Sequence, residues 1–156
     1  MPGMFVLIVG CGRVGSNLAR SMLSDGHTVS CLDRDPESHN RLEVGMDRSW
    51  EEAGGRFTVG AALETEALET AGIERADAFV AATNGDNTNI VISQIAQRRY
   101  RVETVIARIL DPFRAEWYRE QGLETICPTR VAIEMLEGQL RLAAGAGPGA
   151  AGGERG

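Results

Sequence analysis

A glycine-rich turn after the apolar run at residues 4–9 is the feature that most constrains this chain. Gly10, Gly12 and Gly15 follow the pattern G-x-G-x-x-G, and the acidic residue Asp33 comes about 20 positions later. Gly10 permits a tight turn, Gly12 lets the backbone approach a pyrophosphate, and Gly15 lets a helix pack close to the strand. This pattern predicts an adenine-nucleotide site with its phosphates at a helix N-terminus. A purely structural glycine turn is the alternative.

The composition is that of one water-soluble domain. The 156 residues are enough for a single hydrophobic core. No apolar run approaches the roughly 20 residues of a membrane helix, and no signal peptide is recognisable, so we expect no direct membrane insertion. The net charge of −6 disfavours nucleic acid as a partner.

Lysine is absent, and all 16 basic residues are arginine. A phosphate loop of the Gly-Lys-Ser/Thr type is therefore excluded. Chemistry that requires a Schiff-base lysine is excluded as well.

Cysteine and histidine give little sign of metal or redox chemistry. Cys11, Cys31 and Cys127 lie in or beside apolar strand segments, so core packing is the favoured role. His27 and His39 fall in a turn and in a polar helix, and we expect no metal site.

Strands and helices are predicted to alternate along the chain. The expected strands are 4–9, 27–32, 57–59, 78–82, 104–109 and 123–127. Helices are expected at 13–24, after Asp35-Pro36, at 63–71, at 87–99, after Asp111-Pro112 and at 129–142, with a loop and a fragment of helix at 45–56. This order predicts an α/β fold, a doubly wound parallel six-stranded Rossmann sheet of order 3-2-1-4-5-6, with its ligand crevice at the carboxyl ends of strands one and four. Residues 1–142 would form the domain, and residues 143–156 a disordered Gly/Ala-rich tail or linker.

Three segments should meet at this crevice. Asp33 is placed to accept hydrogen bonds from the ribose hydroxyls and to repel a 2′-phosphate, although Arg34 beside it could accommodate one. Arg13 in the glycine loop is suited to bind phosphate oxygens, with a solvated helix-start arginine as the alternative. The predicted nucleotide-binding residues are Gly10, Cys11, Gly12, Arg13, Val14, Gly15, Asp33, Arg34, Thr83, Asn84 and Arg108. Asn84 and Asn87 serve equally well as turn or cap residues.

Four segments taken together resemble one known family. They are the glycine loop with Arg13, the sequence Leu-Asp-Arg-Asp-Pro at 32–36, the segment 71–90, and Ala-Arg-Ile-Leu-Asp-Pro at 107–112. They resemble the N-terminal nucleotide-binding domain of RCK proteins, which include Trk/Ktr-type cytosolic regulators of potassium uptake and gating domains of potassium channels. The resemblance covers about residues 4–140.

The resemblance implies a Rossmann domain that binds NAD or NADH, or alternatively ATP/ADP, without turnover. It also implies a cytoplasmic homodimer that assembles into a ring on a membrane potassium channel or transporter subunit. By position, Gly10, Gly12, Arg13 and Gly15 would contact phosphate, Asp33 and Arg34 the ribose and adenine, and Thr83, Asn84 and Arg108 the rest of the nucleotide. Some family members carry a metal-coordinating glutamate where this chain has Thr129, so no metal is carried over, and the usual second domain is missing.

Two other functions compete with this regulator. One is the cofactor domain of an NAD-dependent oxidoreductase, which would also need a proton donor and a substrate pocket. The absence of lysine and of a second domain disfavours it, and we expect no enzyme activity. The other is a nucleotide-binding scaffold for a different protein partner.

The last predicted helix is apolar around more than one face. Its apolar residues are Val131, Ile133, Met135, Leu136, Leu140 and Leu142. Trp117 and Tyr118, on the preceding helix, belong to residue types enriched at interfaces. We expect this helix to mediate dimerisation; the alternative is that it covers the sheet edge at strand six.

Overall fold

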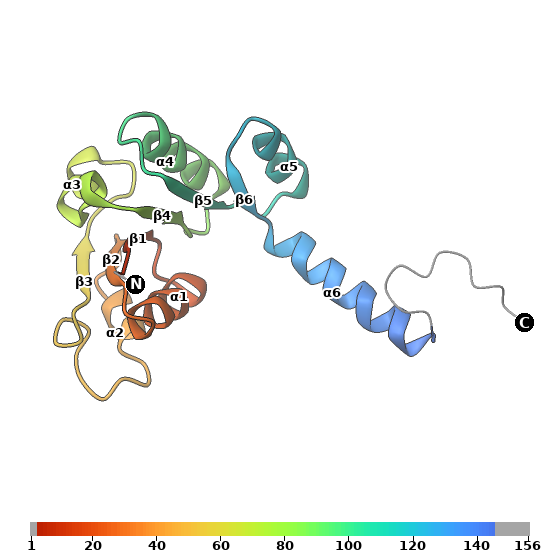
Figure 1. The fold of residues 1–156 in the computed structure, drawn as a ribbon, viewed down its shortest axis with the longest axis horizontal. Coiled ribbons are helices and arrows are strands. Elements are labelled where there is room, and N and C mark those ends of the chain that lie inside the picture. Colours follow the sequence, from red (N-terminus) through yellow and green to blue (C-terminus); the bar gives the residue numbers. More distant parts are fainter. Residues whose placement is uncertain (1–2, 146–156) are drawn as a thin grey trace, which may run out of the picture.

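The computed structural model describes residues 3–145 and contains the predicted Rossmann sheet (Figure 1). Six strands pair in the order β3-β2-β1-β4-β5-β6, and every pair is parallel. The elements are β1 (Phe5–Val9), α1 (Arg13–Ser24), β2 (Thr28–Asp33), α2 (Ser38–Leu42), β3 (Arg56–Val59), α3 (Thr65–Ala71), the 3₁₀ turn η1 (Ile73–Arg75), β4 (Ala78–Ala81), α4 (Asp86–Arg98), β5 (Thr104–Arg108), α5 (Pro112–Glu120), β6 (Glu124–Ile126) and α6 (Pro128–Ala143).

Alternate residues of β1 serve two separate cores. Leu7 and Val9 join a cluster with residues of α3 and α4, whereas Val6 and Ile8 join a second cluster with Ala19 of α1. Successive side chains of a strand point to opposite faces, so a strand covered on both sides becomes continuously apolar. Helices therefore cover both faces of the sheet. Because β1 pairs with β2 and β4 in parallel, the carboxyl ends of these three strands lie along one edge.

The first helix approaches the sheet through small residues. Gly15, Ser16 and Ala19 are its buried residues, whereas Val14 is 49% exposed. The close approach of α1 to β1 therefore depends on small side chains at the contact.

The second helix begins later than the sequence predicted. Asp35 accepts a hydrogen bond from the Glu37 amide, and this turn delays the helix to Ser38. Residues 45–55 form turns and bends instead of a loop with a helix fragment, and they close over the fully buried Trp50, whose indole N–H donates to the Arg56 carbonyl.

The last helix leads away from the rest of the domain (Figure 1). None of the residues of α6 is buried, so the alternative that this helix covers the sheet edge is excluded. The helix reaches Ala143, one residue beyond the predicted end, and residues 146–156 of the predicted tail lie outside the described residues. Between residues 3 and 145, no helix combines the length and apolar character needed to cross a membrane.

Replacing Gly15 with alanine should destabilise the fold. A Cβ on Gly15 would overlap the carbonyl oxygen of Gly10, so α1 would have to move away from the β1 turn. We expect a loss of about 1–3 kcal/mol in the free energy of unfolding, measured by urea denaturation. Gly12→Ala is the matched control, because a Cβ at Gly12 meets no atom within 4 Å. Equal stability of the two variants would contradict this account of the turn.

Candidate nucleotide-binding site

A single large cavity lies at the carboxyl ends of the central strands. Its volume is about 1130 Å³, and residues from the β1, β2, β4 and β5 ends line it. The predicted residues that line it are Gly10, Gly12, Arg13, Val14, Asp33, Arg34, Thr83, Asn84 and Arg108. The remaining two predicted residues, Cys11 and Gly15, are not part of its lining.

The glycine turn leaves the N-terminus of α1 open toward this cavity. Gly10 has a φ of +97°, and a side chain there would collide with the backbone of Ala82 and Thr83. Gly12 is the N-cap, no side chain accepts a hydrogen bond from the first turn, and that turn holds no acidic residue. Uncapped N–H groups together with the helix dipole favour an anion at this position.

Asp33 has a structural role that the sequence did not predict. One carboxylate oxygen accepts a hydrogen bond from the Cys11 amide at 2.7 Å, and the other accepts one from the Asp35 amide at 2.9 Å. The carboxylate therefore ties the glycine loop to the end of β2. Each oxygen retains a second lone pair, so acceptance of a ligand hydroxyl is compatible with these bonds.

Asn89 positions the loop after β4, and the sequence prediction missed it. Its side chain is 1% exposed and binds the amide (3.1 Å), hydroxyl (2.6 Å) and carbonyl (3.0 Å) of Thr83 as well as the Arg108 carbonyl (2.8 Å). A signal was present in the sequence, since Asn89 shares the inward face of α4 with Ile92 and Ala96 at helical spacing. A polar residue on a buried face needs hydrogen-bond partners.

The cavity concentrates positive charge on a chain whose net charge is −6. Five arginines and two aspartates line it; the arginines are Arg13, Arg20, Arg34, Arg41 and Arg108. Arg20 and Arg41 were not predicted, although Arg20 follows Arg13 by two helical turns. This excess of guanidinium groups suits an anionic ligand.

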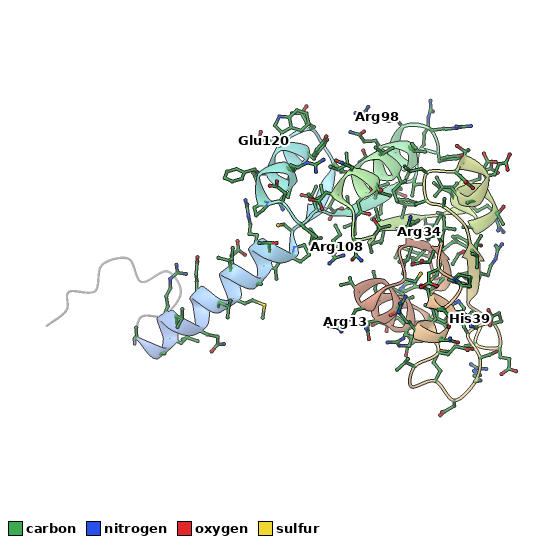
Figure 2. All side chains as sticks on the ribbon, turned by 180° about the vertical axis from the view of Figure 1, so that it is seen from behind. Arg13, Arg34, His39, Arg98, Arg108 and Glu120 are labelled. Atoms are coloured by element: carbon green, nitrogen blue, oxygen red, sulfur yellow. The ribbon has the colours of Figure 1, made fainter. Side chains whose placement is uncertain are left out.

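The cavity arginines differ in the number of hydrogen bonds that they already form; Figure 2 labels Arg13, Arg34 and Arg108. Among residues 3–145, the side chains of Arg13 and Arg34 form no hydrogen bond or ion pair. Arg108 donates to the Thr83 carbonyl at 3.2 Å and the Asn84 side chain at 3.3 Å, whereas its buried Nε has no partner in the described part of the chain. Arg13 and Arg34 are thus free to bind a ligand, and Arg108 is held beside the Thr83 loop.

The cysteines lie in the core, as predicted. Cys11, Cys31 and Cys127 are all buried. A hydrogen bond with the Cys11 thiol and burial both raise the pKa of the Cys31 thiol well above its usual range. Since the thiolate is the reactive form, the Cys31 thiol is held unreactive.

The amino-acid sequence matches the TrkA-N domain family over residues 6–128. The chain belongs to this family. The predicted resemblance to the N-terminal domain of RCK proteins is thereby confirmed.

Curated relatives are longer than this chain. The Trk system potassium uptake protein TrkA of Streptomyces coelicolor is 42% identical over 145 residues, which are 93% of this chain and 61% of that protein. A TrkA homologue of Methanothermobacter thermautotrophicus is 35% identical over 135 residues, which are 86% of this chain and 59% of that protein. This TrkA-N chain therefore spans about three fifths of the length of these relatives.

Solved structures share the fold. The TrkA-N domain of the inner membrane protein YbaL from Escherichia coli is 25% identical with a TM-score of 0.68, covering 86% of this chain and 96% of that one. The AMP-bound Kef C-terminal domain of Shewanella denitrificans is 24% identical with a TM-score of 0.71. The match covers 90% of this chain and 82% of that one. ADP-bound GsuK is 21% identical with a TM-score of 0.72, and the match covers 90% of this chain and 34% of that one. The similarity to the Kef and GsuK structures shows only that they share the Rossmann fold.

Replacing Asn89 with alanine should destabilise the domain, because buried backbone groups of Thr83 and Arg108 would lose their partner. We expect a loss of about 2 kcal/mol or more in chemical denaturation. Ser93→Ala is the matched control on the same helix, since the buried Ser93 hydroxyl has no partner in the described structure. Its stability should stay within about 0.5 kcal/mol of the parent chain. A comparable loss in both variants would show that general packing of α4, and not the Thr83 loop, is responsible.

Proposed function

We propose that this chain is the nucleotide-binding regulatory domain of a Trk-type potassium uptake protein. It would bind NAD(H) or ATP/ADP without turnover and gate a membrane potassium transporter or channel from the cytoplasmic side. The observation that carries this proposal is the arginine-lined cavity at the uncapped N-terminus of α1.

The cavity suits the part that NAD(H), ATP and ADP have in common, an adenosine diphosphate. The phosphates would lie at the α1 N-terminus, with Arg13 on one side and Arg108 on the other. The ribose would lie at Asp33, whose carboxylate disfavours the 2′-phosphate of NADP. The glycine loop follows β1, and Asp33 ends β2. These two strands are neighbours in the sheet, which supports the placement of phosphates and ribose side by side.

An apolar surface for adenine is present near the ribose end. Val44 and Leu63 line the cavity and are 64% and 58% exposed, so their apolar surface is available to a ligand. A purine ring between these side chains and Arg34 would cover apolar surface and stack on a guanidinium plane. The AMP and ADP named for the Kef and GsuK structures carry the same base.

A regulator fits the cavity better than an oxidoreductase does. Among the described residues, no histidine, tyrosine or cysteine lines the cavity, and the chain holds no lysine. The lining carboxylates, Asp33 and Asp35, lie at the proposed adenosine end. Hydride transfer would also require a proton donor near the nicotinamide, so the absence of histidine, tyrosine, cysteine and lysine from the described lining supports the regulator.

The curated relatives support a partner for this domain. They are Trk system potassium uptake proteins, so we assign the domain a membrane potassium transporter or channel subunit as its target. A nucleotide-binding scaffold with another protein partner is the competing function. Co-purification with a membrane subunit distinguishes the two.

We assign α6 and the neighbouring α5 to a homodimer interface, from which a ring could be built. The apolar residues of α6 are exposed by 45–70%; they are Val131, Ile133, Met135, Leu136, Leu140 and Leu142. On α5, Phe113 is 88% and Trp117 55% exposed. An unpaired apolar surface of this extent on a small domain favours association, and a two-fold interface would place each α6 on the other subunit.

Replacing Gly12 with valine should abolish nucleotide binding and leave the fold intact. The added side chain would occupy the place of the phosphates, yet a Cβ at Gly12 meets no protein atom within 4 Å. Isothermal titration of ligand-stripped protein with NAD, NADH, ATP and ADP measures the effect, and circular dichroism checks the fold. At least one of these ligands should bind the parent protein, and none should bind the variant.

Two results would count against the proposal. One is the failure of all four nucleotides to bind the stripped parent protein. The other is a change in absorbance at 340 nm when the protein is mixed with NADH and a carbonyl substrate, since this would show hydride transfer.

Replacing Leu136 with aspartate should dissociate the proposed dimer. A charge in an apolar interface removes the roughly 1.5–3 kcal/mol that a buried leucine contributes, so the dimer should weaken at least about tenfold. Light scattering after size-exclusion chromatography measures the mass. Val91→Asp is the control, because Val91 is an exposed apolar residue of α4, away from α6 (43% exposed). A parent protein that is monomeric at tens of micromolar would refute the interface.

A further inference from the structure

A second group of side chains lies where α2 meets the loop at 43–55, and it is not part of the nucleotide cavity. His39, Glu43 and Glu51 each offer a possible ligand atom, and these atoms lie within 4.8 Å of one another. None of the three lines the cavity. Figure 2 shows His39 on the part of the domain that carries α2.

We propose that this group binds a divalent transition-metal ion of the Zn²⁺ class. His39 would bind the ion through Nε2, Glu51 through its carboxylate, and Glu43 would orient the imidazole ring through Nδ1–H. This site is independent of the proposed nucleotide function.

The distance between His39 and Glu51 is close to that of two ligands of one ion. Nε2 lies 2.7 Å and 3.0 Å from the two carboxylate oxygens of Glu51. In a tetrahedral zinc site with bonds of about 2.0–2.1 Å, two ligand atoms are roughly 3.3 Å apart. A shift of less than about one ångström therefore admits the ion, and Glu51 has room for it because its side chain is 54% exposed.

Glu43 occupies the position that orients a metal-binding histidine. One of its oxygens lies 3.5 Å from Nδ1 of His39, and the other accepts the Trp50 amide at 2.7 Å. Trp50 is fully buried, so this amide is a fixed anchor for the carboxylate. Metal-binding histidines commonly donate their second ring N–H to such a carboxylate, which fixes the tautomer and the ring orientation.

The ring is restrained from a further side. Phe57 of β3 packs against His39 edge-on, with ring centroids 5.5 Å apart. A histidine held by an aromatic ring and a carboxylate loses little side-chain entropy when it binds an ion.

The donor set selects the class of metal. Imidazole favours zinc, copper, nickel and iron, whereas calcium and magnesium prefer oxygen ligands alone. Water would fill the remaining coordination positions, since His39 and Glu43 are about 30% exposed. The competing role of the group is an ion pair between a protonated His39 and two carboxylates, which requires no metal.

The sequence did not reveal this site. His39 and Glu43 are four residues apart, which places them on one side of α2 and the turn that follows it. Glu51 joins them only because the intervening loop folds back over Trp50.

Isothermal titration of metal-stripped, untagged protein with ZnCl₂ tests the proposal. We expect one site per chain with micromolar affinity. His39→Gln and Glu51→Gln should abolish binding at this site, and Glu43→Gln should weaken it about tenfold or more. His27→Gln is the matched control, because His27 is the other histidine of the chain and lies outside the group. Its affinity for Zn²⁺ should equal that of the parent.

Two further measurements keep the test independent of folding effects. Zn²⁺ should raise the melting temperature of the parent and His27→Gln proteins and leave that of Glu51→Gln unchanged. Co²⁺ in place of Zn²⁺ should give visible d–d bands without a thiolate charge-transfer band. Failure to bind Zn²⁺, binding that survives both His39→Gln and Glu51→Gln, or a thiolate band that assigns the ion to cysteine would each overturn the proposal.

Discussion

The close approach of α1 to the end of β1 is the constraint on which the cavity depends. Gly15 lies against the Gly10 carbonyl, at a distance that no side chain would allow. This contact directs the N-terminus of α1 at the carboxyl ends of the strands, where its unpaired N–H groups favour an anion. Asp33 then fixes the loop between them through the Cys11 amide. The same few backbone contacts thus determine both the packing of the first βα unit and the electrostatic character of the site.

Most of the fold could be predicted from the sequence because a parallel sheet covered on both faces has continuously apolar strands. The runs in β1 and β4 are of this type, and glycine, aspartate and proline between elements mark their ends. The errors fell where local hydrogen bonds decide the outcome. The Asp35 turn delays α2, and hydrogen bonds around the buried Trp50 replace the expected helix fragment with turns; neither effect is visible in periodicity.

The residues of the candidate site likewise fall into those that the sequence predicts and those that it does not. Residues within the glycine loop and at the end of β2 could be found because their roles depend on short, regular spacing. The helical spacing of Asn89 marks it as a buried residue of α4, but its contacts to the Thr83 loop depend on how distant segments pack. The place of Arg41 in the cavity depends on such packing as well. The group around His39 is the extreme case, because its third member arrives through a loop closed by a buried tryptophan.

The exclusive use of arginine has a consequence for how such a cavity responds to its surroundings. Guanidinium groups remain protonated throughout the physiological pH range, and no histidine lines the cavity among residues 3–145. Dissolved salt weakens the attraction between exposed arginines and a phosphate group, since it screens charges that are farther apart than the Debye length. This length is about 8–10 Å near physiological ionic strength. The strength with which this cavity holds an anion would therefore depend on the ionic strength of its surroundings.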